Sequence, residues 1–289
     1  MSENVSPPLK WSSGTSLFTK GGSKKNRMSI SERFQGANVV DAGRLSPYWG
    51  EHAARYIFAL PFVENKSVLD IACGTGYGIA ILKNQAKHVT GVDVDDEAAK
   101  EAMVECGNKV AVLLGNGLGL PFADNSFDVI TSFETLEHIH ERGKFLAELN
   151  RVLKPVGKLI LSTPNANYTM PVNGKPSNPF HVFEYAPAEL REELERFFNL
   201  ESFLGQTLDA SIKIPPFYDA QRRLPKDLGT QSRLFGWKVI NKMPSGIREG
   251  LSGALWRKPF YPTEIDYHFS SETVELAPIL VAVCTQKDL

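Results

Sequence analysis

The sequence has 289 residues, a formal net charge of −1 at pH 7, and a composition in which 42% of the residues are hydrophobic. Such a composition excludes a disordered chain, and the length suits one large α/β domain or a domain with an elaborated insertion. The near-neutral charge excludes a global attraction to nucleic acid or to membranes. Cys73, Cys106 and Cys284 form no C-x-x-C pair and lie in apolar runs, so we expect reduced, buried thiols.

Residues 1–40 are rich in Ser, Gly and Lys and show no periodicity, which predicts a disordered N-terminal arm. Their composition leaves a transit peptide open, although no amphipathic helix is evident. Residues 1–28 lack the apolar core of a secretion signal, and no stretch approaches the roughly 18 apolar residues of a membrane span. We therefore expect a cytoplasmic protein.

From about residue 47, apolar runs and helical spacings alternate along the chain. The predicted elements are, in order, a helix at 48–60, a strand at 68–73, a helix at 79–82, a strand at 89–94, a helix at 97–104, strands at 110–114 and 127–133, a helix at 145–153, a strand at 159–162, a helix at 187–197, and strands at 203–208 and 279–284.

Continuous apolar strands separated by helices indicate an α/β fold with a Rossmann-like, doubly wound, mostly parallel sheet that is covered on both faces. A ligand then belongs at the carboxyl ends of the strands, near the topological switch point. Residues 41–208 are expected to form this core, and residues 277–289 supply its last strand. Residues 209–276 have no room in the basic sheet and are predicted to form a helical cap or insertion.

A glycine-rich turn, D-I-A-C-G-T-G-Y-G, follows the first predicted strand at residues 70–78. Glycines allow positive φ angles and a close approach of the backbone to a ligand, and the following helix offers unpaired N–H groups. Asp93 ends the second predicted strand, where a carboxylate can accept both hydroxyls of a ribose. Turn and carboxylate together predict a cofactor of the adenosine type, which leaves NAD open.

The spacing of the glycines narrows this prediction. Gly74, Gly76 and Gly78 form G-x-G-x-G rather than G-x-G-x-x-G, and Asp70 precedes them inside the strand. Asp70 can orient the turn and receive an amino group of a cofactor. A dinucleotide site has a pyrophosphate there and little use for a further carboxylate, so an NAD dehydrogenase is the less favoured reading.

Three further motifs follow in order: G-N-G-L-G-L-P-F at 115–122, S-F-D-V-I at 126–130 and L-N-R-V-L-K-P-V-G-K at 149–158. With the glycine turn, they make the chain resemble the class I S-adenosylmethionine-dependent methyltransferases, within the broad small-molecule group that includes quinone and sugar methyltransferases. The resemblance covers about residues 50–208 and the last strand near 278–286. It implies a seven-stranded sheet with an antiparallel last strand, and S-adenosyl-L-methionine as the cofactor.

The resemblance also implies roles for individual residues around that cofactor. The family often has Asp where this chain has Asn116, whose amide oxygen can still accept a hydrogen bond from the adenine amino group. The implied contacts are Asp70, Ala72, Gly74, Gly76 and Phe133 at the methionine end, Asp93 at the ribose, Val94 against the adenine ring, and Asn116 and Gly117 at the adenine edge.

The tip of the fourth predicted strand, where Phe133 is followed by Glu134 and His138, borders the reacting methyl group in this architecture. A hydroxyl acceptor must lose a proton, and histidine is suited to accept it near neutral pH. If a helix begins here, Glu134 and His138 lie one turn apart on one face, so that the acid orients the imidazole. The alternative is that His138 only packs in this loop.

A second candidate base, His181, lies in N-P-F-H-V-F-E-Y at 178–185. The preceding loop, 164–179, is long and polar and is expected to hang over the site as a lid. His181, close to Tyr185 in the sequence, is expected to contact an acceptor hydroxyl, the alternative being a histidine with a role only in the turn. The segment loosely resembles one in methyltransferases of bacterial polysaccharide and glycolipid assembly. The histidines otherwise lack metal-ligand spacing apart from His138 and His140, so no metal site is expected.

Residues 213–258 within the predicted insertion are strongly basic, with ten Lys and Arg residues against Asp219, Asp227 and Glu249. Aromatic and aliphatic residues are interleaved with these charges. Such a stretch can dock on an anionic membrane surface or a phosphorylated substrate. The alternative is a cap that packs its apolar face on the core and exposes its charges to solvent.

These features predict a methyltransferase that acts on a hydroxyl of a small-molecule or glycan-type acceptor, with no nucleic-acid partner. Two alternatives stay open. One is a quinone or lipid C- or O-methyltransferase, and the other is an interaction protein that binds S-adenosylmethionine without catalysis.

Overall fold

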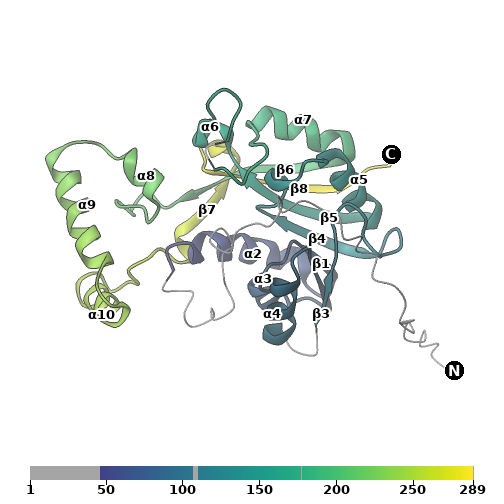
Figure 1. Ribbon diagram of the computed structural model, residues 1–289, viewed down its shortest axis with the longest axis horizontal. Coiled ribbons are helices and arrows are strands. Elements are labelled where there is room, and N and C mark those ends of the chain that lie inside the picture. Colours follow the sequence, from purple (N-terminus) through teal and green to yellow (C-terminus); the bar gives the residue numbers. More distant parts are fainter. Residues whose placement is uncertain (1–45, 107–109, 177, 289) are drawn as a thin grey trace, which may run out of the picture. The chain divides into compact units, whose positions relative to one another are not determined.

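The computed structural model describes residues 46–106, 110–176 and 178–288 (Figure 1). The predicted arm at 1–40 lies outside the described residues. The helices are α2 (Trp49–Val63), α3 (Tyr77–Leu82), α4 (Asp96–Cys106), α5 (Arg142–Val152), α6 (Ala166–Thr169), α7 (Pro187–Phe197), α8 (Tyr218–Arg222), α9 (Leu228–Asn241) and α10 (Ser245–Trp256), with 3₁₀ turns η3 (Leu136–His138), η4 (Glu264–Asp266) and η5 (Ser271–Thr273).

Eight strands form one sheet in the order β3-β2-β1-β4-β5-β8-β6-β7. The chain crosses over between β3 and β4, so β1 and β4 lie side by side at the switch point. The pairs from β3 to β5 are parallel, whereas β8 is antiparallel to both β5 and β6. The strands are β1 (Ser67–Ile71), β2 (His88–Asp93), β3 (Val110–Leu114), β4 (Phe127–Phe133), β5 (Leu153–Pro164), β6 (Phe198–Leu208), β7 (Tyr267–Ser270) and β8 (Ile279–Gln286).

Helices cover both faces of this sheet, which explains why its central strands are mostly apolar. On one face, Tyr56 of α2, Ile79 of α3 and Ala102 of α4 pack into one buried cluster. On the other face, Phe145 of α5 and Leu190 of α7 pack into a second cluster. Figure 1 shows the two helix layers on opposite sides of the sheet. The predicted α/β class with a mostly parallel sheet is confirmed.

One strand more than the predicted seven is present. The extra strand, β7, lies inside the segment 209–276 and pairs antiparallel with β6 at the edge of the sheet. Its four residues, Tyr267–Ser270, are too few to show a hydrophobic period. The remainder of that segment contains α8, α9 and α10, in line with the helices that we predicted there.

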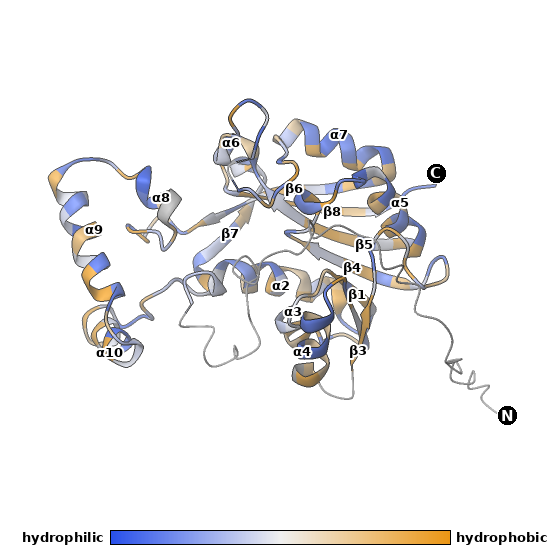
Figure 2. Cartoon of the chain, in the orientation of Figure 1, coloured by the Kyte–Doolittle hydropathy of each residue, from blue (hydrophilic) through white to orange (hydrophobic). Residues whose placement is uncertain are grey.

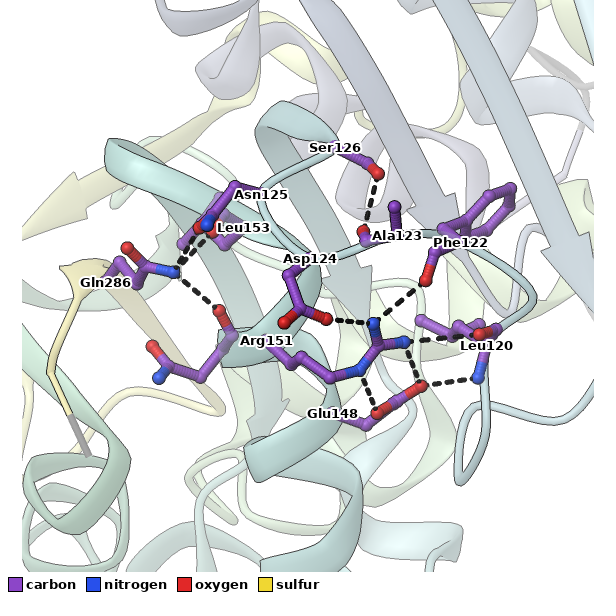
Figure 3. Close-up of polar contacts among 11 residues, drawn as sticks. Leu120, Phe122, Ala123, Asp124, Asn125, Ser126, Glu148, Arg151, Leu153 and Gln286 are labelled. Atoms are coloured by element: carbon purple, nitrogen blue, oxygen red, sulfur yellow. Dashed lines mark hydrogen bonds and ion pairs between the residues drawn. The ribbon is translucent and has the colours of Figure 1, made fainter.

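Arg151, within the motif at 149–158, fastens the loop that joins β3 to β4 (Figure 3). Its guanidinium donates to both carboxylate oxygens of Glu148 at 2.8 and 2.7 Å, to Asp124 at 2.6 Å, and to backbone carbonyls of the same loop. Glu148 in turn accepts the backbone N–H of Leu120 at 2.6 Å. The planar fork of arginine suits this set of acceptors, so the motif at 149–158 holds in place the loop that begins at Asn116.

Two simple expectations can be compared directly with the structure. Cys73, Cys106 and Cys284 are all buried free thiols, as expected. Among the described helices, none combines the length and the hydropathy that crossing a membrane requires.

Candidate functional site

The glycine turn between β1 and α3 is built on left-handed backbone conformations. Gly74 has a φ angle of +55° and Gly76 one of +87°, and the non-glycine Ala72 has +58°. A Cβ on Gly76 would lie 2.9 Å from the Cβ of Ala102, whereas one on Gly74 would meet no atom within 4 Å. Gly76 is therefore required by the packing of α4, while Gly74 leaves open space above the turn.

Asp93, at the end of β2, ties this turn to the next loop. Its carboxylate accepts the backbone N–H of Gly74 at 2.8 Å and that of Asp95 at 2.8 Å. A carboxylate has about four lone-pair positions, so two accepted bonds leave capacity for ligand hydroxyls. Asp93 thus shapes the turn, and its predicted role at a ribose stays a prediction.

Asp70, the last polar residue of β1 before the turn, is fully buried. It accepts hydrogen bonds from the Thr131 hydroxyl at 2.7 Å and from the Tyr56 hydroxyl at 3.2 Å. Burial raises the pKa of Asp70 to about 7, against the lowering effect of these two donors. A cationic group of a ligand placed beside Asp70 would stabilise its charged form.

A second buried polar group lies on α2, which the sequence analysis did not include in the site. Arg55 is 1% exposed, donates to Gln206 of β6 at 2.9 Å, and leaves its Nε without a hydrogen-bond partner. Burial would lower the pKa of Arg55, but the carboxylates of Glu134 and Glu51 outweigh it and raise that pKa. The sequence signal for this site was an arginine followed in α2 by an apolar run from Tyr56 to Val63.

The residues predicted to meet an adenine ring lie on the other side of the turn. Val94 is 71% exposed directly after β2, which suits a side chain that a ligand covers. The Asn116 side-chain oxygen accepts the backbone N–H of Leu118 at 3.0 Å. A Cβ on Gly117 would lie 2.6 Å from the Phe145 ring, so packing alone already requires this glycine.

No helix begins directly at the end of β4, where we had considered one. Glu134 has a φ angle of +49°, which a right-handed helix excludes, and η3 begins only at Leu136. The Glu134 carboxylate accepts the Ser162 hydroxyl at 2.6 Å. The helix that would have placed Glu134 one turn from His138 is therefore not formed here, and a role of Glu134 towards His138 stays a prediction. Phe133, predicted at the methionine end, packs edge-to-face on Tyr56 with ring centroids 4.9 Å apart.

The two candidate bases, which we predicted separately, meet in one place. The rings of His138 and His181 are nearly perpendicular, with centroids 4.9 Å apart. The backbone carbonyl of Glu137 accepts the N–H of Val182 at 2.8 Å, which holds the His181 loop against η3. By contrast, His140, the other member of the pair noted in the sequence, is exposed.

The two imidazoles differ in what their nitrogens contact. His138 donates from Nδ1 to the Phe180 carbonyl at 3.2 Å, because a carbonyl can only accept. Its Nε2 then carries a lone pair and lies 4.0 Å from Glu137 Oε1. Burial and then the neighbouring His181 lower the pKa of His138, so its neutral form dominates at pH 7.

His181 is engaged at both ring nitrogens. Its Nδ1 donates to Glu184 at 2.8 Å, and its Nε2 accepts from the Asn178 amide at 3.0 Å. Burial opposes ionisation of Glu184, but hydrogen bonds from His181 and Thr169 outweigh it and hold the pKa of Glu184 below its usual value. Glu184 therefore fixes the tautomer and orientation of His181, a role that the sequence analysis missed.

One ligand-capable atom from each of Glu137, His138 and His181 lies within 4.8 Å of the others. His181 already uses both nitrogens, so it could bind a cation only if Asn178 moved. Burial and then the nearby Glu134 raise the pKa of Glu137 well above its usual value, so the neutral acid is favoured there. Glu137 Oε2 accepts the Thr163 hydroxyl at 3.0 Å, whereas its buried Oε1 has no hydrogen-bond partner.

Comparison with known proteins decides the family. Residues 69–161 match the family described as a methyltransferase domain. A Mycolicibacterium smegmatis protein named as an S-adenosylmethionine-dependent methyltransferase is 37% identical over 160 residues, covering 55% of this chain and 62% of that protein. Demethylmenaquinone methyltransferase of Staphylococcus haemolyticus is 32% identical over 166 residues, covering 54% of this chain and 67% of that enzyme.

This chain belongs to the class I S-adenosylmethionine-dependent methyltransferases. Membership implies S-adenosylmethionine as the cofactor. The expected methyl donor is thereby confirmed, and the dinucleotide NAD, which the glycine turn alone left open, is not the cofactor of this family. The open space above Gly74, the exposed Val94 and the remaining acceptor capacity of Asp93 fit such a ligand. The matched region nevertheless spans only 62% of the Mycolicibacterium smegmatis relative, and the individual contacts stay predictions.

Solved structures agree with this methyltransferase fold. A chain of the complex between the Haloferax volcanii Trm112 methyltransferase activator and a methyltransferase superposes with a TM-score of 0.56 and 20% identity, covering 90% of this chain and 99% of that chain. The [4+2]-cyclase SpnF superposes with a TM-score of 0.53 and 18% identity, covering 82% of each chain. Because one neighbour is a cyclase, the fold alone does not establish methyl transfer.

Proposed function

We propose that this protein transfers a methyl group from S-adenosylmethionine to a hydroxyl of a small-molecule or glycan-type acceptor, with His138 as the general base. The observation that carries the proposal is the hydrogen bond from His138 Nδ1 to the Phe180 carbonyl. This bond fixes the tautomer whose Nε2 can accept a proton. His138 follows the end of β4 by a few residues, and β4 adjoins the β1 strand that leads into the glycine turn.

The proton balance of the reaction explains why such a base is useful. The bound cofactor supplies an electrophilic methyl group on a sulfonium, and the acceptor oxygen attacks it. As the new O–CH₃ bond forms, the S–CH₃ bond breaks and its electron pair stays on sulfur, so that S-adenosylhomocysteine leaves. The acceptor O–H bond also breaks, and His138 Nε2 takes this proton. Burial favours the neutral, proton-accepting form of His138, and general bases contribute typically about 10²–10⁴-fold to such steps.

His181 and Glu184 support this base in the proposal. His181 stands edge-on to the His138 ring, and Glu184 and Asn178 hold it in place through both of its nitrogens. His181 is thereby a positioning residue in this proposal, whereas the sequence analysis considered it as a second candidate base.

A quinone or lipid acceptor is the second candidate, because several relatives are demethylmenaquinone methyltransferases. Besides the Staphylococcus haemolyticus enzyme, that of Listeria welshimeri is 31% identical over 170 residues. A protein that binds S-adenosylmethionine without catalysis is the alternative from another class. These candidates differ in whether, and with which acceptor, S-adenosylhomocysteine is released.

The test is a screen of nucleotide sugars, glycans and quinones for S-adenosylhomocysteine release by the full-length protein. Release with a hydroxylated sugar, and methylation at its oxygen by mass spectrometry, is the expected result. Release only with quinones would favour the second candidate. Calorimetric binding of S-adenosylmethionine with no release for any acceptor class would contradict the proposal and favour a non-catalytic protein.

A further inference from the structure

The helices α9 and α10 expose apolar side chains in regular rows. We call these rows the apolar stripes. They consist of Leu228, Phe235 and Val239 on α9 and Ile247, Leu251, Leu255 and Trp256 on α10, which are between 36% and 85% exposed. Their spacing of mostly four and seven residues puts the members of each row on one side of the helix. Figure 2 shows hydrophobic and hydrophilic residues interleaved along both helices.

The inner side of α10 is polar, which is the reverse of an ordinary surface helix. Arg248 and Ser252 are buried there, at 7% and 0% exposure. Arg248 lies over the Tyr261 ring at 4.6 Å and donates to its hydroxyl at 3.2 Å, while Ser252 donates to the Lys258 carbonyl at 2.8 Å. The face of α10 that packs against the rest of the protein is therefore the polar one, with Arg248 and Ser252. The apolar stripe, with Leu251 and Leu255, faces the solvent instead.

The segment that carries the stripes is rich in cations. Residues 213–258 carry a charge of +7, because ten basic residues face three acidic ones, whereas the rest of the chain carries −8. Within the described part of the chain, exposed Lys242, Arg257 and Lys258 form no ion pair. Arg257 and Lys258 directly follow Trp256, whose side chain is 53% exposed.

We propose that the apolar stripes of α9 and α10 and the lysines and arginines around them dock this protein on an anionic lipid bilayer surface. Apolar residues enter the boundary of headgroups and acyl chains, and the cations pair with lipid phosphates. Tryptophan favours the same interface, because its ring is amphipathic. The proposal does not depend on which acceptor is methylated.

The charges favour a bilayer over a second copy of this chain. Two copies that met through the stripes would bring Lys242, Arg257 and Lys258 of both copies together, and like charges repel. An anionic bilayer instead neutralises them. The −8 carried by the rest of the chain would then turn the remainder of the protein away from the lipid surface.

The test is flotation of the full-length protein with vesicles of phosphatidylcholine alone or mixed with phosphatidylglycerol. We expect binding to the mixed vesicles that weakens with added salt. The double variant K242Q/K258Q should bind them about 30-fold more weakly, because each cation near an anionic surface contributes on the order of a few-fold to tenfold. The double variant L251Q/L255Q should lose binding to a similar or greater extent.

Matched controls come from other exposed positions. Ile265 and Leu276 are 79% and 81% exposed, and Lys87 and Lys175 are also exposed, so I265Q/L276Q and K87Q/K175Q remove the same side-chain types elsewhere. Both controls should bind like the unchanged protein. Equal binding by stripe and control variants would overturn the proposal. So would no binding to anionic vesicles, or self-association in sedimentation that L251Q/L255Q abolishes.

Discussion

The rings of His138 and His181 stand edge to face with their centroids 4.9 Å apart, although the two residues come from different loops. The Phe180 carbonyl, directly before His181 in the chain, fixes the tautomer of His138. The loop that carries His181 thus sets the chemistry of His138, and the two histidines form one site rather than two candidate sites.

The first prediction concerns His138 itself. The substitution H138Q should lower kcat by about 10²–10⁴-fold, because it removes the proton-accepting nitrogen. The affinity for S-adenosylmethionine in calorimetry should stay unchanged. H140Q is the control, since His140 is exposed two residues further on. If both variants turn over the acceptor at the same rate, His138 is not the base.

The second prediction is the pH dependence of that base. Burial and His181 both lower the pKa of His138 from its usual 6.5, and protonated His138 cannot accept the acceptor proton. Activity should therefore fall only below pH 6.5, on the acid side of the kcat/KM profile. In H181Q one of the two lowering causes is gone, so the acid limb should move to higher pH. A limb that stays in place would show that His181 does not act on His138.

The third prediction concerns stability without the cofactor. The pKa of Asp70 is raised to about 7 in the folded protein, from a usual value of 3.8. The folded state then binds the proton more tightly than the unfolded state, so the contribution of Asp70 to stability is present below pH 3.8 and is lost as the pH rises towards 7. The loss amounts to at most about 4 kcal/mol.

Urea unfolding at several pH values measures this effect. D70N should remove part of the decline in the free energy of unfolding between pH 4 and 7, while it keeps a partner for the Tyr56 and Thr131 hydroxyls. D96N, at an exposed position on α4, controls for the loss of one carboxyl group. An unchanged pH slope in D70N would show that Asp70 is not the group responsible.

The fourth prediction separates the two glycines of the turn. G76A should lower the free energy of unfolding by roughly 2–5 kcal/mol, because the left-handed backbone and the contact with Ala102 both oppose a Cβ. G74A should cost only about 1 kcal/mol, since its Cβ would meet open space. G74A should nevertheless weaken S-adenosylmethionine binding, as measured by calorimetry on folded protein. Equal unfolding energies for the two variants would contradict the packing argument.

The sequence predicted the strands that are buried on both faces, because a short run of mostly apolar residues is typical of such a strand. It missed β7, which has only four residues at the sheet edge, of which only Tyr267 is buried. It also placed the start of β5 too late, since Lys154 and Val156 are not buried. Helix α7 was predicted at its full length, because Pro187 and Glu189 mark its first turn.

The sequence predicted the site residues best where they belong to one short segment of the chain. A sequence motif predicts the turn with Gly74 and Gly76, and Asp93 follows at the end of the next strand, where it binds this turn. Arg55 and the meeting of His138 with His181 depend instead on which distant segments pack together. No spacing in the sequence encodes those contacts, and the helix considered at Glu134 failed on a single positive φ angle.

The segment that carries α8, α9 and α10 leaves the sheet after β6 and returns at β7, two strands that are direct neighbours. At the point of departure and return, the backbone N–H of Asp209 donates to the carbonyl of Asp266 at 2.8 Å. A short hairpin turn could close the same gap without breaking a strand pair. Residues 210–265 therefore leave and rejoin the sheet at a single point of its edge. We expect that a variant with a short turn in their place would keep the remaining strand order.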